Sequence, residues 1–309
     1  MTGKYIGIEF GGTKIQIVLG DENGNICKRL RYNVDKKLAA EGIRNDVENG
    51  ITNILKNEKP LAIGAGFGGP INHKKNEIYR SYHVKGWDGF PLKKWLSDIS
   101  GLPVIIDNDA NIAGFAEALS GAGKGKNPVF YVTLGSGVGG GLIINKKIFH
   151  GAGRAEAEIG HVRFNQQCEI VENYCSGWAA NKRIRSFIDS HSESGLAKIE
   201  GRFEAEILGL ALAENNTDAQ QLLSEIANDI AFSLSHVIHL INPEIIILGG
   251  GLSLLGKPLI KSIKNEIKIY IMDAIYPGPE IVTAALGEDV VPIGALLLAR
   301  QFYLSILNT

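Results

Sequence analysis

The chain has 309 residues, of which 45% are hydrophobic and 21% charged, so it is long enough for two medium-sized domains that share a large core. Its 32 basic and 33 acidic residues leave a formal net charge of -1, which argues against nucleic acid or an acidic membrane surface as a partner. Three cysteines without paired CxxC spacing exclude a disulfide framework and a complete zinc cluster. The chain opens without a basic-then-apolar signal segment, and we expect a cytoplasmic protein that is neither exported nor inserted into a membrane.

The first third of the chain alternates predicted strands and helices. Apolar and β-branched runs predict strands at 4–9, 15–19, 26–34, 61–67 and 103–107. The first three form an antiparallel meander, because short turn segments connect them. Apolar residues spaced by three and four predict a helix from about Ala40 to Lys56, and a second helix follows Asp109. Asn108 and Asp109 therefore lie at a strand-to-helix junction.

The second half begins with the same plan as the first. Residues 129–149 form a strand, a glycine turn and a strand, as residues 5–19 do, so the fold is expected to be internally duplicated. A long helix at 218–240 and a strand at 244–251 follow. The apolar stretch 291–306 is expected to be a helix too short for a membrane that packs on the first domain. We predict two α/β domains with a cleft between them, 1–115 plus about 293–309, and 116–292.

Three glycine loops follow apolar strands, at 11–14, 135–141 and 249–251. Glycine lets backbone amides approach an anion closely, so three such loops favour a polyphosphate ligand, although any one of them is equally well a plain tight turn. The second loop matches GxGxxG, but it leads into a strand pattern instead of a helix, which excludes a dinucleotide fingerprint. No GxxxxGK[ST] motif occurs.

The motifs GGTK, IIDNDAN, TLGSGVGGG, EIGH and ILGGGLS occur in this order along nearly the whole chain. They resemble the ROK family of sugar kinases and sugar-responsive repressors, within the actin, Hsp70 and hexokinase superfamily. The resemblance implies an α/β, two-domain actin-like ATPase (ribonuclease H-like) fold with an interdomain cleft. It also implies ATP-dependent phosphorylation of a hexose or amino-sugar hydroxyl. ATP phosphate contacts are then expected at Gly11, Gly12, Thr13, Lys14, Ser136 and Gly137, and adenosine contacts at Gly249, Gly250 and Gly251.

The NDAN match makes Asp109 resemble the catalytic base of the family. A carboxylate within hydrogen-bond reach can take the proton of a sugar hydroxyl, which is a poor nucleophile, as the phosphoryl group transfers. The competing interpretation is a helix cap, the commoner role of Asp just before a helix. Asn108 beside it resembles a sugar-hydroxyl ligand.

Further sugar contacts are implied by the resemblance. The EIGH motif carries Glu158 and His161, VENYCSG carries Glu172, and GFGGP carries Gly69. Carboxylates accept hydrogen bonds from neighbouring hydroxyls and an imidazole fixes another, which suits sugar binding. Trp87 is as well explained by the core as by the site.

The chain departs from the family pattern at three places. Glu9 stands where most relatives have the Asp that orients a magnesium-bound water, so we expect Mg²⁺ near Glu9 with altered geometry. Only Cys168 remains of the family's zinc-binding cysteine cluster, so no structural zinc is expected. His83 replaces an asparagine that many relatives use on the sugar.

Three functions are compared. A sugar kinase with ATP and Mg²⁺ is favoured, with glucose as the first candidate substrate and amino-sugars, mannose and fructose after it. A DNA-binding repressor is disfavoured, because the chain opens directly at the first phosphate hairpin. A sugar-binding or regulatory protein with weak or lost kinase activity is the alternative. The resemblance also implies a homodimer or homotetramer.

Overall fold

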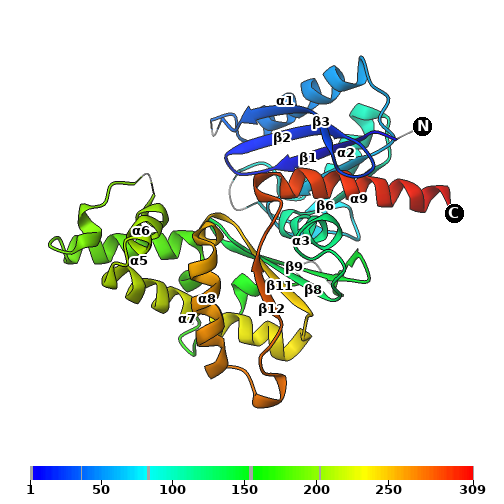
Figure 1. The fold of residues 1–309 in the computed structure, drawn as a ribbon. Helices are drawn as coiled ribbons and strands as arrows, with labels where there is room; N and C mark the ends of the chain where they lie inside the picture. The colour runs from blue at the N-terminus through cyan, green and yellow to red at the C-terminus, as the bar shows by residue number, and fades with distance from the viewer. Residues whose placement is uncertain (1–2, 36, 82–83, 153–155, 202, 309) are drawn as a thin grey trace. The chain divides into compact units, whose positions relative to one another are not determined.

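The computed structural model describes residues 3–35, 37–81, 84–152, 156–201 and 203–308 (Figure 1). The chain forms two compact units, and each is described by itself. Unit 1 comprises Met1–Gly121, Lys146–Glu156 and Leu286–Thr309. Unit 2 comprises Ala122–Asn145 and Ala157–Ala285.

The sheet of unit 1 has strand order β3-β2-β1-β4-β7. Strand β1 is antiparallel to β2 and parallel to β4, and β7 continues the parallel half. The bounds are β1 Tyr5–Phe10, β2 Lys14–Gly20, β3 Ile26–Asn33, β4 Ile63–Phe67 and β7 Val104–Asn108. Strands β1, β2 and β4 are almost entirely buried, as their continuous apolar sequences predict for strands covered on both faces.

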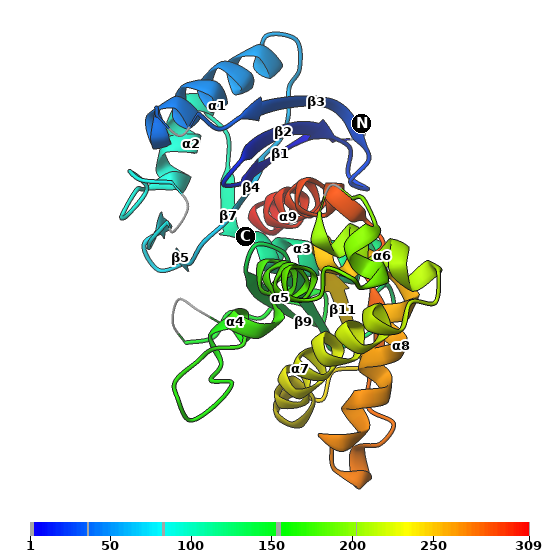
Figure 2. The same ribbon diagram turned by 90° about the vertical axis from the view of Figure 1, so that its left-hand side faces the viewer.

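Helices cover both faces of this sheet (Figure 2). Helices α1 (Ala39–Leu55) and α2 (Leu92–Ser100) lie on one face, and their apolar residues share a core with Ile6, Ile8 and Phe10 of β1. Helices α3 (Asp109–Ser120) and α9 (Val290–Leu307) pack against each other on the other face. Short strands β5 (Ile71–Asn72) and β6 (Glu77–Ile78) pair separately, and β10 (Lys147–Ile148) also belongs to unit 1.

Helix α9 approaches the sheet of unit 1 with almost no space between the backbones. A Cβ atom added to Gly64 of β4 would overlap the carbonyl oxygen of Ala295, and one added to Gly7 would lie 2.8 Å from the Pro292 oxygen. The expectation that this helix is too short for a membrane was wrong on length. The segment Gly287–Leu307 has 21 residues and is long and apolar enough to cross a membrane by length and composition, but half of its most apolar stretch is buried in the protein. Its composition is therefore that of a core helix of this unit.

Unit 2 repeats the sheet plan of unit 1. Its strands lie in the order β9-β8-β11-β12, with bounds β8 Val129–Leu134, β9 Val138–Ile144, β11 Ile245–Gly249 and β12 Glu280–Thr283. Strand β8 is antiparallel to β9 and parallel to β11, as β1 is to β2 and β4. The internal duplication expected from the sequence is therefore present.

The helices of unit 2 pack around one apolar core. They are α4 Glu172–Cys175, α5 Gly177–Ser190, α6 Glu204–Ala213, α7 Thr217–Ile241 and α8 Lys257–Glu266. The long helix α7 begins where the Asn216 side chain accepts a hydrogen bond from the Ala219 amide, and it ends at Asn242 in the left-handed conformation. Short 3₁₀ helices η1 (Ile159–His161) and η3 (Gly251–Leu255) carry two of the predicted motifs.

Candidate functional site

The GGTK turn joins β1 to β2 in unit 1. The Gly11 amide donates to the Lys14 carbonyl oxygen over 3.1 Å, which closes the turn. Thr13 is exposed at its tip. The Lys14 ammonium lies 3.4 Å from the Glu288 carboxylate, so this cation is paired at the exposed end of the turn.

Glu9 lies on β1 directly opposite Gln16 on β2. The side-chain Nε2 of Gln16 donates to Glu9 Oε2 over 2.7 Å, and the side-chain Oε1 of Gln16 accepts from Arg29 and Arg31. Burial raises the pKa of the Glu9 carboxyl, while the Gln16 hydrogen bond and the charge of Lys14 act in the opposite direction. The carboxylate predicted to orient magnesium is thus held by a buried amide.

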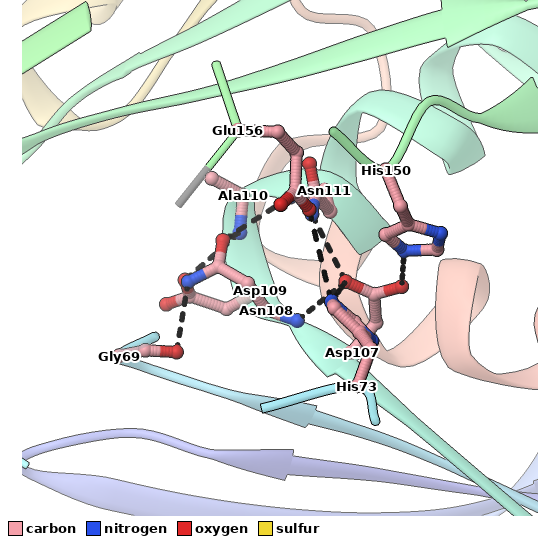
Figure 3. Close-up of polar contacts among 9 residues, drawn as sticks. All are labelled: Gly69, His73, Asp107, Asn108, Asp109, Ala110, Asn111, His150 and Glu156. Carbon is pink, nitrogen blue, oxygen red and sulfur yellow. Dashed lines mark hydrogen bonds and ion pairs between the residues drawn. The ribbon is translucent and has the colours of Figure 1, made fainter. Parts of the chain in front are cut away.

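The β7–α3 junction places Asn108 and Asp109 side by side (Figure 3). Asn108 is the helix cap, because its Oδ1 accepts from the amides of Ala110 and Asn111 over 2.9 and 3.3 Å. Its Nδ2 donates to the Gly69 oxygen over 3.1 Å. The Asp109 Oδ1 accepts from the Ala110 amide over 2.8 Å. Since Asn108 already caps the helix, Asp109 is not needed for that role.

The GFGGP turn of unit 1 lies against Asp109. A Cβ atom added to Gly68 would lie 3.3 Å from Asp109 Oδ2, so the glycine leaves room at that oxygen. The Gly69 carbonyl oxygen is held by Asn108, as described above. These contacts bring the predicted residues Gly69, Asn108 and Asp109 together in one unit.

Trp87 belongs to the core. Its side chain is 1% exposed and makes edge contacts with Phe10, Phe67 and Phe90. His83, which the sequence associates with the sugar, lies outside the described residues.

The second glycine hairpin, between β8 and β9 of unit 2, is closed by the Gly135 amide, which donates to the Gly137 oxygen over 3.0 Å. Glu172 lies directly on it. Its Oε2 accepts from the Val138 amide over 2.9 Å, and a Cβ atom at Gly137 would overlap the same oxygen. Glu172 is therefore held by the hairpin that is predicted to contact ATP.

Glu158 and His161 lie at the two ends of η1. The His161 Nδ1 is 3.6 Å from Glu158 Oε2, and the His161 side chain is 59% exposed. The EIGH motif thus presents a carboxylate and an imidazole three residues apart, on one 3₁₀ turn.

A cavity of about 850 Å³ opens in unit 2 beside the second hairpin. Gly135, Ser136 and Gly251 line one part of it. Most of the other lining side chains are apolar, among them the exposed Trp178 and Leu254, and Asn181 and Glu206 are polar. A volume of this size with an apolar wall and a few polar groups suits a small organic ligand such as a nucleoside.

The three glycines of ILGGGLS have different surroundings. Gly251 lines the cavity, and nothing lies within 4 Å of a Cβ atom placed there. Gly249 packs against the ring of Tyr131, and Gly250 has φ +80° and lies against the backbone of Leu134. Gly250 therefore requires glycine for its own conformation, whatever the ligand.

The cysteines are all free thiols. Cys168 is exposed, whereas Cys175 is buried, and burial raises the pKa of the Cys175 thiol to about 12. Cys175 lies 3.3 Å from the Ser233 hydroxyl, which makes it part of the core of unit 2.

Several residues of these sites were not predicted from the sequence. In the sequence Gln16 is an ordinary strand residue. Its role in holding Glu9 depends on the pairing of these two residues across β1 and β2. Trp178 follows Ser176 and Gly177 and belongs to no motif, although it is an exposed aromatic residue of the cavity wall, as Phe203 is.

Comparison with known proteins matches the ROK family over residues 5–302. A glucokinase of Halalkalibacterium halodurans is 31% identical over 315 residues, which cover 96% of this chain and 95% of that protein. The crystal structure of a ROK family glucokinase from Streptomyces griseus in complex with glucose and AMPPNP gives a TM-score of 0.83 at 28% identity, covering 97% of this chain and 100% of the other. A xylose repressor of Caldicellulosiruptor bescii is 24% identical over 98% of this chain and 79% of the repressor.

Proposed function

Because the chain belongs to the ROK family and has its actin-like ATPase fold, we propose that it phosphorylates a hydroxyl of a hexose or an amino-sugar with Asp109 as the general base. The protein is an ATP-dependent sugar kinase. One observation carries the role of Asp109. Asn108 caps helix α3 through the amides of Ala110 and Asn111, while the Oδ2 atom of Asp109 lies next to the glycine turn at Gly68, where a Cβ atom would be 3.3 Å away.

The proposed chemistry is a direct phosphoryl transfer. The N-terminus of helix α3 favours the ionised carboxylate of Asp109. This carboxylate takes the proton of the sugar hydroxyl, the hydroxyl oxygen forms the new bond to the γ-phosphorus, and the bond from that phosphorus to the bridging oxygen of ADP breaks. The Ala110 amide holds the other oxygen of Asp109 and thereby fixes the direction of the base.

Sugar recognition is assigned to side chains that accept or donate several hydrogen bonds. Asn108 and the Gly69 backbone are held together in unit 1. Glu158 and His161 form a carboxylate and imidazole pair in unit 2, and Glu172 lies on the hairpin there. The polar groups at these five positions can donate hydrogen bonds to, or accept them from, neighbouring hydroxyl groups of a sugar.

The nucleotide is assigned to the glycine turns and the cavity. Amides and polar groups at Gly11, Gly12, Thr13, Lys14, Ser136 and Gly137 are proposed to bind phosphates. The cavity of unit 2 is proposed to bind the adenosine. Gly251 lies at its edge, and the Trp178 ring offers a flat aromatic surface against which the base can stack. Gly249 and Gly250 precede Gly251 in the same loop and are also proposed to contact the adenosine.

Glu9 fits a role near magnesium. Magnesium binds through carboxylates and retained waters, and the Glu9 carboxylate is positioned by Gln16 on the strand that enters the GGTK turn. When bound, Mg²⁺ neutralises charge that develops on the transferring phosphoryl group. Glu9 is proposed to orient this ion through a water.

The proposal extends to the sugar substrate and to the assembly of the protein. Glucose is the first candidate, as in the glucokinase relatives, and amino-sugars, mannose and fructose follow. The protein is proposed to act in the cytoplasm as a homodimer or homotetramer, without structural zinc at Cys168.

The test is a coupled assay of ADP release with magnesium ATP over a panel of hexoses and amino-sugars. We expect turnover with at least one of them that disappears when the sugar is omitted. Sugar phosphate identified by mass spectrometry confirms the acceptor. Absence of turnover over the whole panel, with folded protein, contradicts the proposal.

The alternative is a sugar-binding or regulatory protein whose kinase activity is weak or lost through Glu9. The likeness to a xylose repressor is the observation that favours it. Calorimetry separates the two functions, because the alternative predicts sugar binding without ATP turnover. If the wild-type protein binds sugar without turnover and Glu9→Asp restores turnover, the alternative function is supported.

A further inference from the structure

Two histidines and two carboxylates of unit 1 converge on one point at the C-terminal end of β7 (Figure 3). They are His73, after strand β5, Asp107 on β7, His150, after strand β10, and Glu156. One nitrogen or oxygen atom from each lies within 4.8 Å of the other three. We propose that these four side chains form a binding site for a divalent transition-metal ion, with zinc as the best-suited one.

Three distances between these side chains lie close to those around a four-coordinate ion. Bonds of about 2.0–2.2 Å in a tetrahedron separate neighbouring ligand atoms by roughly 3.4 Å. The His73 Nε2 lies 3.8 Å from Asp107 Oδ1 and 3.7 Å from Glu156 Oε1. The His150 Nε2 lies 2.7 Å from Asp107 Oδ2, a hydrogen bond that opens slightly when both atoms bind an ion instead.

A buried oxygen without a partner points to a ligand. The Glu156 side chain is 6% exposed, and its Oε2 makes no hydrogen bond among the described residues. Leaving a carboxylate oxygen in this condition costs free energy, because burial removes its water. A metal ion supplies the missing partner, and Figure 3 shows the Glu156 carboxylate directed into the cluster.

The surroundings orient the proposed ligands. The Asn111 Nδ2 donates to Asp107 Oδ1 over 3.0 Å and to Glu156 Oε1 over 2.7 Å, so one amide fixes both carboxylates. The two imidazole rings lie 4.1 Å apart, and His150 is 40% exposed, which provides a path for the ion.

Both carboxylates and imidazoles are suited to this role. The Glu156 carboxylate lies 3.7 Å from the His73 ring, and the Asp107 carboxylate lies 2.7 Å from the His150 ring, so each imidazole has a carboxylate beside it. Two imidazoles with two carboxylates favour zinc and related ions over magnesium, which prefers oxygen and water alone. The ion ties the segment Lys146–Glu156 to β7 within unit 1 and so fixes the strand end that leads to Asp109.

The experiment is a titration of the metal-free full-length protein with Zn²⁺ by calorimetry, and with Mg²⁺ as the comparison ion. We expect one equivalent of Zn²⁺ to bind with release of protons, since ligands are deprotonated on binding, and Mg²⁺ to bind at least about 100-fold more weakly. Co²⁺ gives a second readout, because four-coordinate Co²⁺ has a strong visible absorption. Neither readout depends on kinase activity, so failure of the proposed function leaves this test intact.

Variants locate the ion. Glu156→Gln and His73→Asn are each expected to weaken Zn²⁺ binding by about 100-fold or more, because even loss of an outer partner costs 10–100-fold. Matched controls are Glu193→Gln and His191→Asn, at exposed positions, which retain wild-type affinity. Circular dichroism checks that each variant is folded.

Three outcomes overturn the proposal. The first is no Zn²⁺ binding to the wild-type protein, which makes the cluster a plain hydrogen-bonded network. The second is wild-type affinity in both ligand variants. The third is loss of binding in Cys168→Ser with His161→Asn but not in Glu156→Gln, which places the ion at the EIGH motif instead.

Discussion

Gln16 holds Glu9 by a 2.7 Å hydrogen bond between directly opposed residues of β1 and β2. The same Gln16 side chain accepts from Arg29, which forms an ion pair with Asp289 over 2.7 Å. The acidic residue expected near magnesium is therefore positioned by a buried amide, which is itself held by arginine. This arrangement has consequences for stability at different pH values.

We expect Glu9→Gln to remove a pH-dependent cost of folding. Burial raises the pKa of Glu9 above 4.5, so the folded protein keeps this proton to a higher pH than the unfolded chain does. The favourable contribution of the protonated form is complete below pH 4.5 and is lost as the pH rises through the folded-state pKa. The free energy of unfolding of Glu9→Gln, measured with urea, should therefore exceed that of the wild type by more at neutral pH than at acid pH. The exposed Glu41→Gln is the control, and parallel pH curves for all three proteins contradict the expectation.

Asp109→Asn is expected to separate catalysis from binding. The asparagine oxygen still accepts from the Ala110 amide, so the β7–α3 junction is retained, but the side chain no longer takes a proton. We expect kcat to fall by at least about 100-fold while the sugar dissociation constant stays within a factor of about three. Steady-state kinetics and calorimetry measure the two quantities.

The matched control for this prediction is Asp98→Asn in the same unit. Asp98 is exposed on α2 and pairs with Lys94, so its loss should leave kcat unchanged. Equal kcat in Asp109→Asn and the wild type removes Asp109 from catalysis.

Trp178→Ala is expected to weaken nucleotide binding. The indole is 68% exposed and lines the cavity of unit 2, where it offers a flat apolar surface to a base. Loss of an aromatic contact worth about 0.5–1.5 kcal/mol raises the KM for ATP roughly 2- to 13-fold. The KM for the sugar should change little. Ile269→Ala, which removes another exposed apolar side chain of the same unit, is the control, and an unchanged KM for ATP in Trp178→Ala excludes the cavity as the adenosine site.

The secondary structure was predictable from the sequence where the apolar pattern is strong. The helix expected from about Ala40 to Lys56 is α1, Ala39–Leu55, and the long helix expected at 218–240 is α7, Thr217–Ile241. In both, apolar residues spaced by three and four face a core, so local pattern and tertiary packing agree. The pattern of a strand, a glycine turn and a strand occurs twice in the sequence, and it likewise predicted the internal duplication of the fold.

The site was less predictable, because its contacts join distant segments. The four proposed metal ligands are distant from one another in the sequence or lack the spacing of a metal-binding motif. They are His73, Asp107, His150 and Glu156. Their convergence follows from the parallel order β4-β7 and from the return of residues 146–156 to unit 1. The sequence also left two roles for Asp109, a helix cap or a catalytic base, because it does not show which side chain caps the helix. Only the hydrogen bonds show that Asn108 caps the helix.

Gly64→Ala is expected to destabilise unit 1. A methyl group at this position of β4 would overlap the carbonyl oxygen of Ala295, a backbone atom that α9 cannot move without shifting the whole helix. Overpacking of this kind costs about 1–3 kcal/mol, so the free energy of unfolding measured with urea should fall by that amount. The control is Gly209→Ala in helix α6, where the added carbon makes an ordinary 3.5 Å contact with Leu255 and gains helix propensity. Wild-type stability in Gly64→Ala would mean that α9 does not lie directly on β4, whereas a loss in Gly64→Ala with none in Gly209→Ala assigns the effect to this contact between backbones.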